Sequence, residues 1–175
     1  MADPSMEKTL IDAVDFIRTR FFGKYRGLVT NVDDPENLGR IQAKVPEIYQ
    51  DTVSPWALPC VPFAGSDHGF LVLPEVGDGV WFEFEGGNPS HPIWTGFWWG
   101  NGEIPQPGSK DVRVLINSSG QKIIMDEQNN KIQILHPGGG EFTMTDTDIT
   151  IKTGSSKIVL SASGVSINDG AFEVR

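Results

Sequence analysis

The sequence predicts an all-β fold in which one N-terminal helix precedes a small β-barrel and a C-terminal ladder of short strands. Glycine and proline account for 20 and 12 of the 175 residues, which is typical of a chain rich in turns. Between residues 24 and 102, apolar strand-like segments alternate with turn residues. From about residue 113 onward, apolar residues come in pairs separated by one polar residue, which is the period of a strand with one buried face.

The helix is predicted over residues 4–22, within a first segment of residues 1–23. Asp3 suits the cap position, Pro4 suits the first turn and Gly23 suits the end of a helix. One apolar stripe with helical spacing consists of Met6, Leu10, Val14, Ile17 and Phe21. The stripe predicts one of two contacts, either with the chain's own barrel or with a neighbouring subunit.

Residues 24–102 are predicted to form a small Greek-key barrel of the OB type. A hairpin is expected first, with strands over residues 25–32 and 39–45. The later strand-like segments are residues 54–59, 69–74, 80–85 and 91–100. Alternation predicts six side chains that point into the barrel, namely Ile41, Ala43, Val45, Val80, Phe82 and Phe84.

Residues 111–175 form the predicted strand ladder, joined to the barrel by a linker of residues 103–110. The prolines of the linker predict a stiff, extended connection. The apolar pairs of the ladder begin with Ile132, Ile134, Phe142, Met144, Ile149, Ile151, Ile158, Leu160, Val165 and Ile167, and continue with Phe172 and Val174. Two inward side chains per strand make a stripe too narrow to close a core. Further copies of the chain are therefore expected to cover it, as in β-helices and intertwined prisms.

The charge balance excludes several classes of partner. The net charge is -9, whereas nucleic-acid binders carry a basic stripe, and an anionic membrane surface would repel such a chain. Residues 1–4 are acidic and polar where a secretory leader would be basic, and no apolar run is long enough to span a membrane. The chain is therefore expected to be made in the cytoplasm.

The histidines, the cysteine and the turn carboxylates could in principle bind a metal or act in catalysis, but their sequence contexts favour structural roles. His68, His91 and His136 are too scattered to predict a metal cluster, although three copies of His136 on a symmetry axis would suit zinc or iron. Cys60 lies in an apolar run, which predicts a buried side chain and no nucleophile. The carboxylates at positions 33, 34, 75 and 78 lie in turns, where they bond to the backbone. We expect no enzyme activity, no cofactor and no metal.

Aromatic residues gather in the barrel segment, and they leave two interpretations open. They are Trp56, Trp81, Trp94, Phe97, Trp98 and Trp99. Core packing and subunit contact form the favoured interpretation, in which these rings are buried. The alternative is a carbohydrate-binding OB module on a β-rich stalk, used for adhesion, in which the rings would line an exposed groove.

The barrel segment also carries an ordered series of motifs. They are Gly-Leu-Val-Thr-Asn-Val at 27–32, Asp-Pro at 34–35, Leu-Gly-Arg-Ile-Gln-Ala-Lys-Val-Pro at 38–46, Ser-Pro-Trp-Ala at 54–57, and the stretches 69–84 and 86–96. In this order, over about half of the chain, they resemble phage baseplate assembly protein V and the OB domain of the VgrG spike proteins of type VI secretion. Residues 120–123 and 155–161 resemble the needle repeats of such spikes.

The resemblance implies a homotrimeric central spike of a phage tail, an R-type bacteriocin or an extracellular injection particle. The barrels would ring the threefold axis on the baseplate hub, and the needle would pierce the target cell envelope when the sheath contracts. The ten apolar residues from Ile132 to Ile167 would form the trimer core of an intertwined β-helix. A tip protein of the PAAR type would contact Phe172, Val174 and Arg175, and the helical stripe would contact the hub. Arg40 either bridges an acidic loop or faces the hub.

Overall fold

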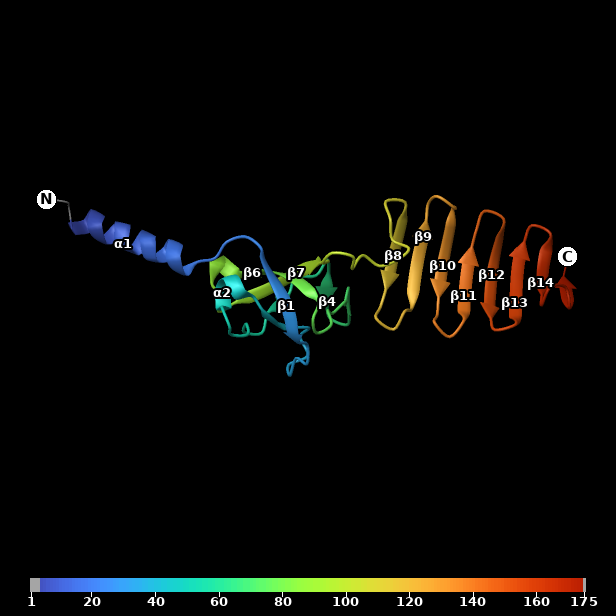
Figure 1. Ribbon diagram of the computed structural model, residues 1–175, viewed down its shortest axis with the longest axis horizontal. Helices are drawn as coiled ribbons and strands as arrows, with labels where there is room; N and C mark the ends of the chain where they lie inside the picture. Colours follow the sequence, from blue (N-terminus) through green and yellow to red (C-terminus); the bar gives the residue numbers. More distant parts are fainter. Residues whose placement is uncertain (1–3, 175) are drawn as a thin grey trace. The chain divides into compact units, whose positions relative to one another are not determined.

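The protein consists of two compact units that divide at Gly100, as seen in a computed structural model that describes residues 4–174. The first unit holds helix α1 (Pro4–Thr19) and a curled five-stranded sheet, and the second holds an eight-stranded sheet (Figure 1). The predicted all-β class with one N-terminal helix is therefore confirmed. Within residues 4–174, no helix combines the length and the apolar character that crossing a bilayer requires.

Helix α1 ends at Thr19, three residues earlier than predicted. The chain leaves the helix because Phe21 joins the barrel: its N–H donates to the Gly87 carbonyl at 2.8 Å, and its ring packs edge-on against Tyr25 and Phe84. The prediction that Phe21 continues the helical stripe is therefore wrong. The other stripe residues, Met6, Leu10, Val14 and Ile17, are exposed. The predicted cap, Asp3, lies outside the described residues.

The barrel is a five-stranded sheet that closes through residues 53–59. Its strands are β1 (Tyr25–Asn31), β2 (Gln42–Lys44), β3 (Leu58–Pro59), β6 (Gly79–Phe84) and β7 (Pro92–Trp98), in the order β2-β1-β6-β7-β3. Val53 pairs with Lys44 of β2, and Ala57 pairs with Ile41 just before β2. On the other side, Leu58 of β3 pairs with Ile93 of β7. Short helical turns, α2 (Pro46–Tyr49) and η1 (Glu85–Gly87), connect the strands.

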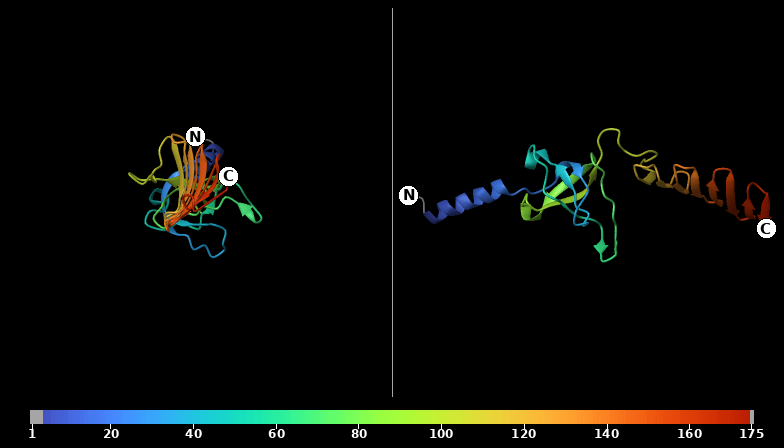
Figure 2. Two further views of the ribbon diagram at one scale, coloured as in Figure 1. Left: turned by 90° about the vertical axis from the view of Figure 1, so that its right-hand side faces the viewer. Right: turned by 90° about the horizontal axis from the view of Figure 1, so that it is seen from below.

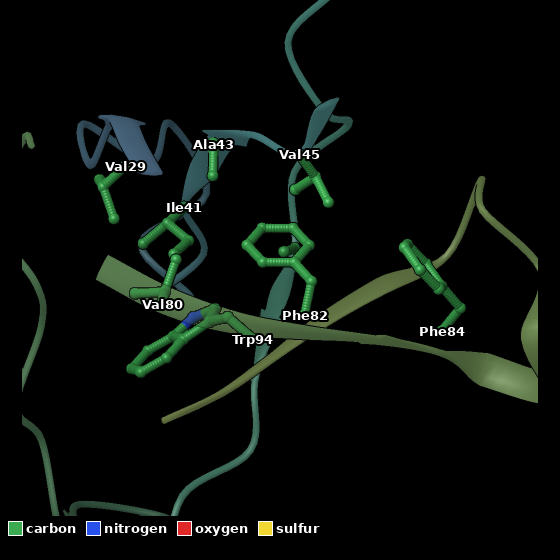
Figure 3. Packing of buried hydrophobic residues seen from close by; sticks show 9 residues of the cluster. Val29, Ile41, Ala43, Val45, Val80, Phe82, Phe84 and Trp94 are labelled. Atoms are coloured by element: carbon green, nitrogen blue, oxygen red, sulfur yellow. The ribbon is translucent and has the colours of Figure 1, made fainter. Parts of the chain in front are cut away.

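The barrel core consists of the six side chains that alternation predicts, together with Val29, Ala57 and Trp94 (Figure 3). Ile41, Ala43, Val45, Val80 and Phe82 are fully buried, and Phe84 is 8% exposed. The Trp94 indole N–H donates to the Gly39 carbonyl at 3.1 Å, so its polar atom is satisfied within the core. The inward positions predicted for this barrel are confirmed.

One predicted barrel strand does not exist. Residues 70–74 form no strand; instead, β4 (Ala64–Gly65) and β5 (His68–Gly69) pair with each other in a small separate hairpin, visible in Figure 2 as a projection from the barrel. Apolar side chains along this segment, such as Phe63, Leu71 and Val76, are exposed. Cys60 is also exposed, so its predicted burial is wrong. The apolar run misled the prediction because β3 ends at Pro59 and the backbone of Cys60 makes a hydrogen bond to the Trp94 carbonyl at 2.9 Å while its side chain stays exposed.

The second unit is an antiparallel meander in which each strand pairs with the next. Its strands are β8 (Val112–Ile116), β9 (Lys122–Asp126), β10 (Lys131–Leu135), β11 (Gly140–Met144), β12 (Asp148–Thr153), β13 (Ser156–Ser161), β14 (Gly164–Ile167) and β15 (Phe172–Val174). Figure 2 shows these strands as successive rungs of one twisted sheet. A single chain thus forms a sheet, and an intertwined β-helix requires further copies.

The linker is not extended as predicted. Residues 105–108 form a turn closed by a hydrogen bond from the Gly108 N–H to the Pro105 carbonyl at 2.8 Å. The bond between Gln106 and Pro107 is cis. The Lys122 ammonium of strand β9 donates to the Gln106 carbonyl at 3.4 Å, so the linker folds back along the first strands of its own unit.

The burial of Tyr49 predicts a loss of stability in alkali. Its hydroxyl donates to the Pro89 carbonyl at 2.6 Å, its ring packs edge-on against Phe84, and burial raises its pKa to about 12. The folded state favours the neutral phenol, so this contribution is complete below about pH 10 and is lost between about pH 10 and 12. In a Tyr25→Phe variant, the phenolate absorbance of Tyr49 should appear only near pH 12 and should coincide with unfolding of the barrel. A titration midpoint near 10 in a folded barrel would contradict this expectation.

Candidate functional site

The eight-stranded sheet has one face that carries two rows of apolar side chains in register. We call this the apolar face. The first row runs through Met125, Ile132, Met144, Ile149, Leu160 and Val165. The second row runs through Leu115, Ile123, Ile134, Phe142, Ile151, Ile158, Ile167 and Phe172. Because side chains alternate across a strand, both rows lie on the same side of the sheet.

The apolar face is left open in a single chain. Leu115 is 56% exposed and Ile134 is 51% exposed, although both lie mid-strand in a regular sheet. Burying one side chain of this kind stabilises a protein by about 1.5–3 kcal/mol, and monomers rarely expose an apolar patch of this extent. The apolar face is therefore an interaction surface.

The opposite face is mostly polar and internally bonded from β10 onward, apart from Leu135 and Val159, whereas Val114 of β8 and the buried Ile124 of β9 pair on it as apolar neighbours. The Gln133 amide donates to the Thr143 hydroxyl at 3.1 Å, and that hydroxyl donates to the Glu141 carboxylate at 2.6 Å. Lys152 lies directly across from Glu141, which places opposite charges side by side. This face suits contact with water, so the sheet as a whole is amphipathic.

All ten residues expected in the trimer core lie on the apolar face. Sequence reasoning missed three more members, Leu115, Ile123 and Met125. Their strands contain the runs Val114-Leu115-Ile116 and Ile123-Ile124-Met125, in which unbroken apolar residues hide the alternation. In the later strands, polar residues stand next to the paired apolar residues, so the alternation can be seen in the sequence.

The predicted partner contacts lie at the two ends of the described chain. At the C-terminal end, β15 is an edge strand; Phe172 is 60% exposed, Val174 continues the register opposite Val165, and Arg175 lies outside the described residues. At the N-terminal end, Met6, Leu10, Val14 and Ile17 are exposed on α1, whereas Phe21 belongs to the barrel.

Arg40 and Asp34 form the strongest electrostatic contact of the barrel unit, and they hold a loop. Asp34 Oδ1 accepts from Arg40 Nε at 2.9 Å and from Nη2 at 2.6 Å, and the Asp34 carboxylate also accepts from the backbone N–H groups of Glu36, Leu38 and Arg40. The guanidinium lies over the Trp56 ring at 5.6 Å. Arg40 holds the pKa of the Asp34 carboxyl well below its usual range, aided by the backbone donors and outweighing burial.

This loop geometry assigns Arg40 and Asp34 a structural role. Asn37 and Gly39 adopt positive φ angles of 55° and 73°, which turn the backbone around the carboxylate. In a similar way, Asp78 Oδ2 accepts from the Glu75 N–H at 2.7 Å. The carboxylates of Asp34 and Asp78 thus accept from backbone donors, as their turn contexts predict.

Replacing Asp34 with asparagine should destabilise the barrel at neutral pH, because the ion pair and part of the backbone cradle are lost. We expect a melting temperature lowered by roughly 5–10 °C at pH 7. A depressed carboxyl pKa stabilises the fold above about pH 4 and loses this effect as the pH falls further, so wild type and variant should converge in acid. Thermal melts at pH 7 and pH 2 test this, with Asp33→Asn at the exposed neighbour as the control. A constant difference across this range would contradict it.

The aromatic residues do not gather around a groove. Trp94 is buried, whereas Trp81 and Trp98 flank the Arg26 guanidinium at 5.5 and 5.3 Å, and Phe97 and Trp99 are exposed. A shallow cavity of about 440 Å³ beside β3 and β7 is lined by Leu58, Pro59, Cys60, Val61, Ala64, Glu83, Glu85, Ile93 and Thr95. This lining contains no aromatic ring, so it lacks the stacking surface that the carbohydrate-binding alternative requires.

The three histidines lie in turns or short strands and bond locally. His136 Nδ1 accepts from the Gly138 N–H at 3.0 Å, in the turn between β10 and β11. His91 Nδ1 lies 3.2 Å from the Asn88 amide nitrogen, and His68 Nδ1 lies 2.9 Å from the Ser66 carbonyl. Over residues 4–174, no three His, Cys, Asp or Glu side chains are grouped in a way that would hold a metal ion.

Comparison with known families assigns both units. Residues 25–99 match the type VI secretion system/phage-baseplate injector OB domain. Residues 113–173 match the phage baseplate V C-terminal trimerisation domain. No curated protein matches the chain at a significant level. The two matched segments coincide with the barrel and with the sheet that carries the apolar face.

Proposed function

Because the chain belongs to the baseplate V and VgrG-like spike proteins, we propose that three copies form the central spike that a contractile tail or injection-system baseplate drives into a target envelope. The trimerisation domain indicates a homotrimer, and the family indicates assembly into a phage or secretion-system baseplate. The family does not by itself indicate that the trimer punctures an envelope, and this role is what we propose here.

The observation that carries this proposal is the apolar face of the eight-stranded sheet. Three such faces directed at one axis give every exposed apolar row a partner, while the three polar faces remain in water. The result is a triangular prism whose core runs through all eight strands. A prism of this kind resists bending because each strand is bonded to its neighbours and packed against two other copies.

Two contacts complete the proposed particle. The exposed stripe of α1, at Met6, Leu10, Val14 and Ile17, meets the baseplate hub. The last strand, with Phe172, meets a PAAR-like tip protein that covers the open edge of the sheet. The role is mechanical and needs no catalytic group, which agrees with turn carboxylates that serve the backbone.

The mass of the purified chain in solution tests the proposal. Light scattering should give about three times the 19.2 kDa chain mass, and the complex should survive SDS without heating. Three sheets packed along their whole length must separate before SDS can solvate the core, which makes dissociation slow. A monomer in the absence of detergent would refute the spike and make a stalked adhesion module the better account.

A further inference from the structure

Among the described residues, the apolar face carries one charged pair, formed by Arg113 of the first strand, β8, and Glu127 directly after β9. Arg113 pairs with Met125, which pairs with Ile132, so Arg113 occupies the first-row position of β8. The other first- and second-row positions of the described strands are apolar. Arg113 Nη1 donates to Glu127 Oε1, and the two side chains are 54% and 62% exposed in the single chain.

We propose that three Arg113–Glu127 pairs meet around the threefold axis at the first strand of the trimerisation domain and fix the register of the three chains. This inference rests on the proposed trimer. Each guanidinium offers five N–H donors and each carboxylate about four acceptor positions, whereas the contact within one chain uses one of each. Arg113 of one copy can therefore also donate to Glu127 of the next copy, which closes a ring of alternating charges.

The need for such a ring follows from the uniformity of the rows. Isoleucine stands at five of the eight second-row positions, and every pair of rows looks much like the next. Apolar packing alone therefore accepts a neighbouring copy shifted by two strands almost as readily as an aligned one. A shifted copy would place the Arg113–Glu127 pair against isoleucine side chains, where its remaining N–H donors and carboxylate oxygens would be buried without partners. A polar group at one core position is a known means of specifying register.

Other charged groups near this pair make the ring sensitive to acid once the arginine is removed. The Glu127 N–H donates to the Asp111 carbonyl at 3.0 Å, and the Asp111 carboxylate pairs with Lys110 at 3.4 Å. On the adjacent hairpin Asp146 accepts from Asn130, and on the opposite face Asp126 accepts from Asn129 at 2.8 Å. Without Arg113, acidic groups predominate at this end of the sheet in all three copies.

The test compares four variants of the full chain by light scattering and by thermal dissociation in SDS. Arg113→Met and Glu127→Gln each break the proposed ring, and the double variant removes it. Lys157→Met is the matched control, because it breaks an ion pair with Asp169, 2.6 Å long, that involves the opposite face of the same sheet.

We expect Arg113→Met to lower the dissociation temperature by roughly 10 °C or more at pH 7, and acid near pH 4 to restore part of the loss by protonating carboxylates. The double variant should regain stability but should also form species heavier than a trimer, because staggered chains leave apolar strands uncovered. The control should stay within about 2 °C of wild type.

An Arg113→Met trimer that matches Lys157→Met in dissociation temperature at both pH values would overturn the inference. So would a double variant that is stable and uniformly trimeric. If Arg113→Met yields no folded protein, Glu127→Gln gives the same comparison with a smaller change in side-chain volume. A wild-type chain that is not trimeric would instead refute the proposed function, so the two failures are distinguishable.

Discussion

Replacing Ile151 with aspartate is expected to convert the trimer into monomers. Ile151 lies in the middle of the second row, opposite Phe142 on one neighbouring strand and Ile158 on the other. In the proposed prism, threefold symmetry would bring three aspartates into the apolar core, where unpaired charges are strongly disfavoured. Light scattering should report a mass near 19.2 kDa instead of three times that value, and SDS resistance should be lost.

The neighbouring residue supplies the control for this experiment. Thr150 belongs to the same strand but points to the polar face, opposite Thr143 and Val159. Thr150→Asp introduces the same side chain one position away and should remain an SDS-resistant trimer. If Thr150→Asp dissociated and Ile151→Asp did not, the polar face would be the interface and the assignment of the core would be reversed.

Replacing Phe82 with alanine should unfold or nearly unfold the barrel. Phe82 is fully buried between β1 and β7, and the backbone of Gly27 approaches its ring so closely that a Cβ at Gly27 would lie 3.3 Å away. Truncating such a ring removes about 3–5 kcal/mol, which is a large share of the 5–15 kcal/mol that stabilises a typical domain. Urea unfolding followed by tryptophan fluorescence should show a midpoint that is strongly lowered or absent.

Phe63→Ala separates the effect of burial from that of ring loss. Phe63 is 56% exposed beside the small β4–β5 hairpin, so its removal should change the free energy of unfolding by no more than about 0.5 kcal/mol. Equal losses in Phe82→Ala and Phe63→Ala would show that Phe63 is also buried, which in this chain requires a contact with another copy.

The sequence predicted the barrel core well because its alternation is regular. Ile41, Ala43 and Val45 alternate with polar residues on one strand, and Val80, Phe82 and Phe84 alternate with Trp81 and Glu83 on another. Period-two patterns report directly on which face is buried, and here no competing pattern exists. The same rule located the ten later members of the apolar face.

The segment after Pro59 shows where such reasoning fails. The run Phe70-Leu71-Val72-Leu73 has the composition of a buried strand, yet its side chains are exposed and its backbone joins no sheet. Composition does not distinguish burial within one chain from an exposed loop, because pairing depends on distant residues. For the same reason Cys60 was expected inside, and Phe21 was assigned to a helix that the barrel interrupts. The Arg113–Glu127 pair became visible only once the register was known.

Because β8 to β15 pair strictly in sequence, the length of the proposed needle depends only on the number of strands. Neighbouring strands of any sheet are about 4.8 Å apart, so each hairpin lengthens the prism by about 10 Å and contributes the same pair of rows. Removing residues 148–163, which hold two adjacent strands and two turns, would bring β11 next to β14 with Met144 facing Val165 and Phe142 facing Ile167. The length of the domain can therefore be changed, by evolution or by design, through the insertion or removal of whole hairpins. Its cross-section would stay the same.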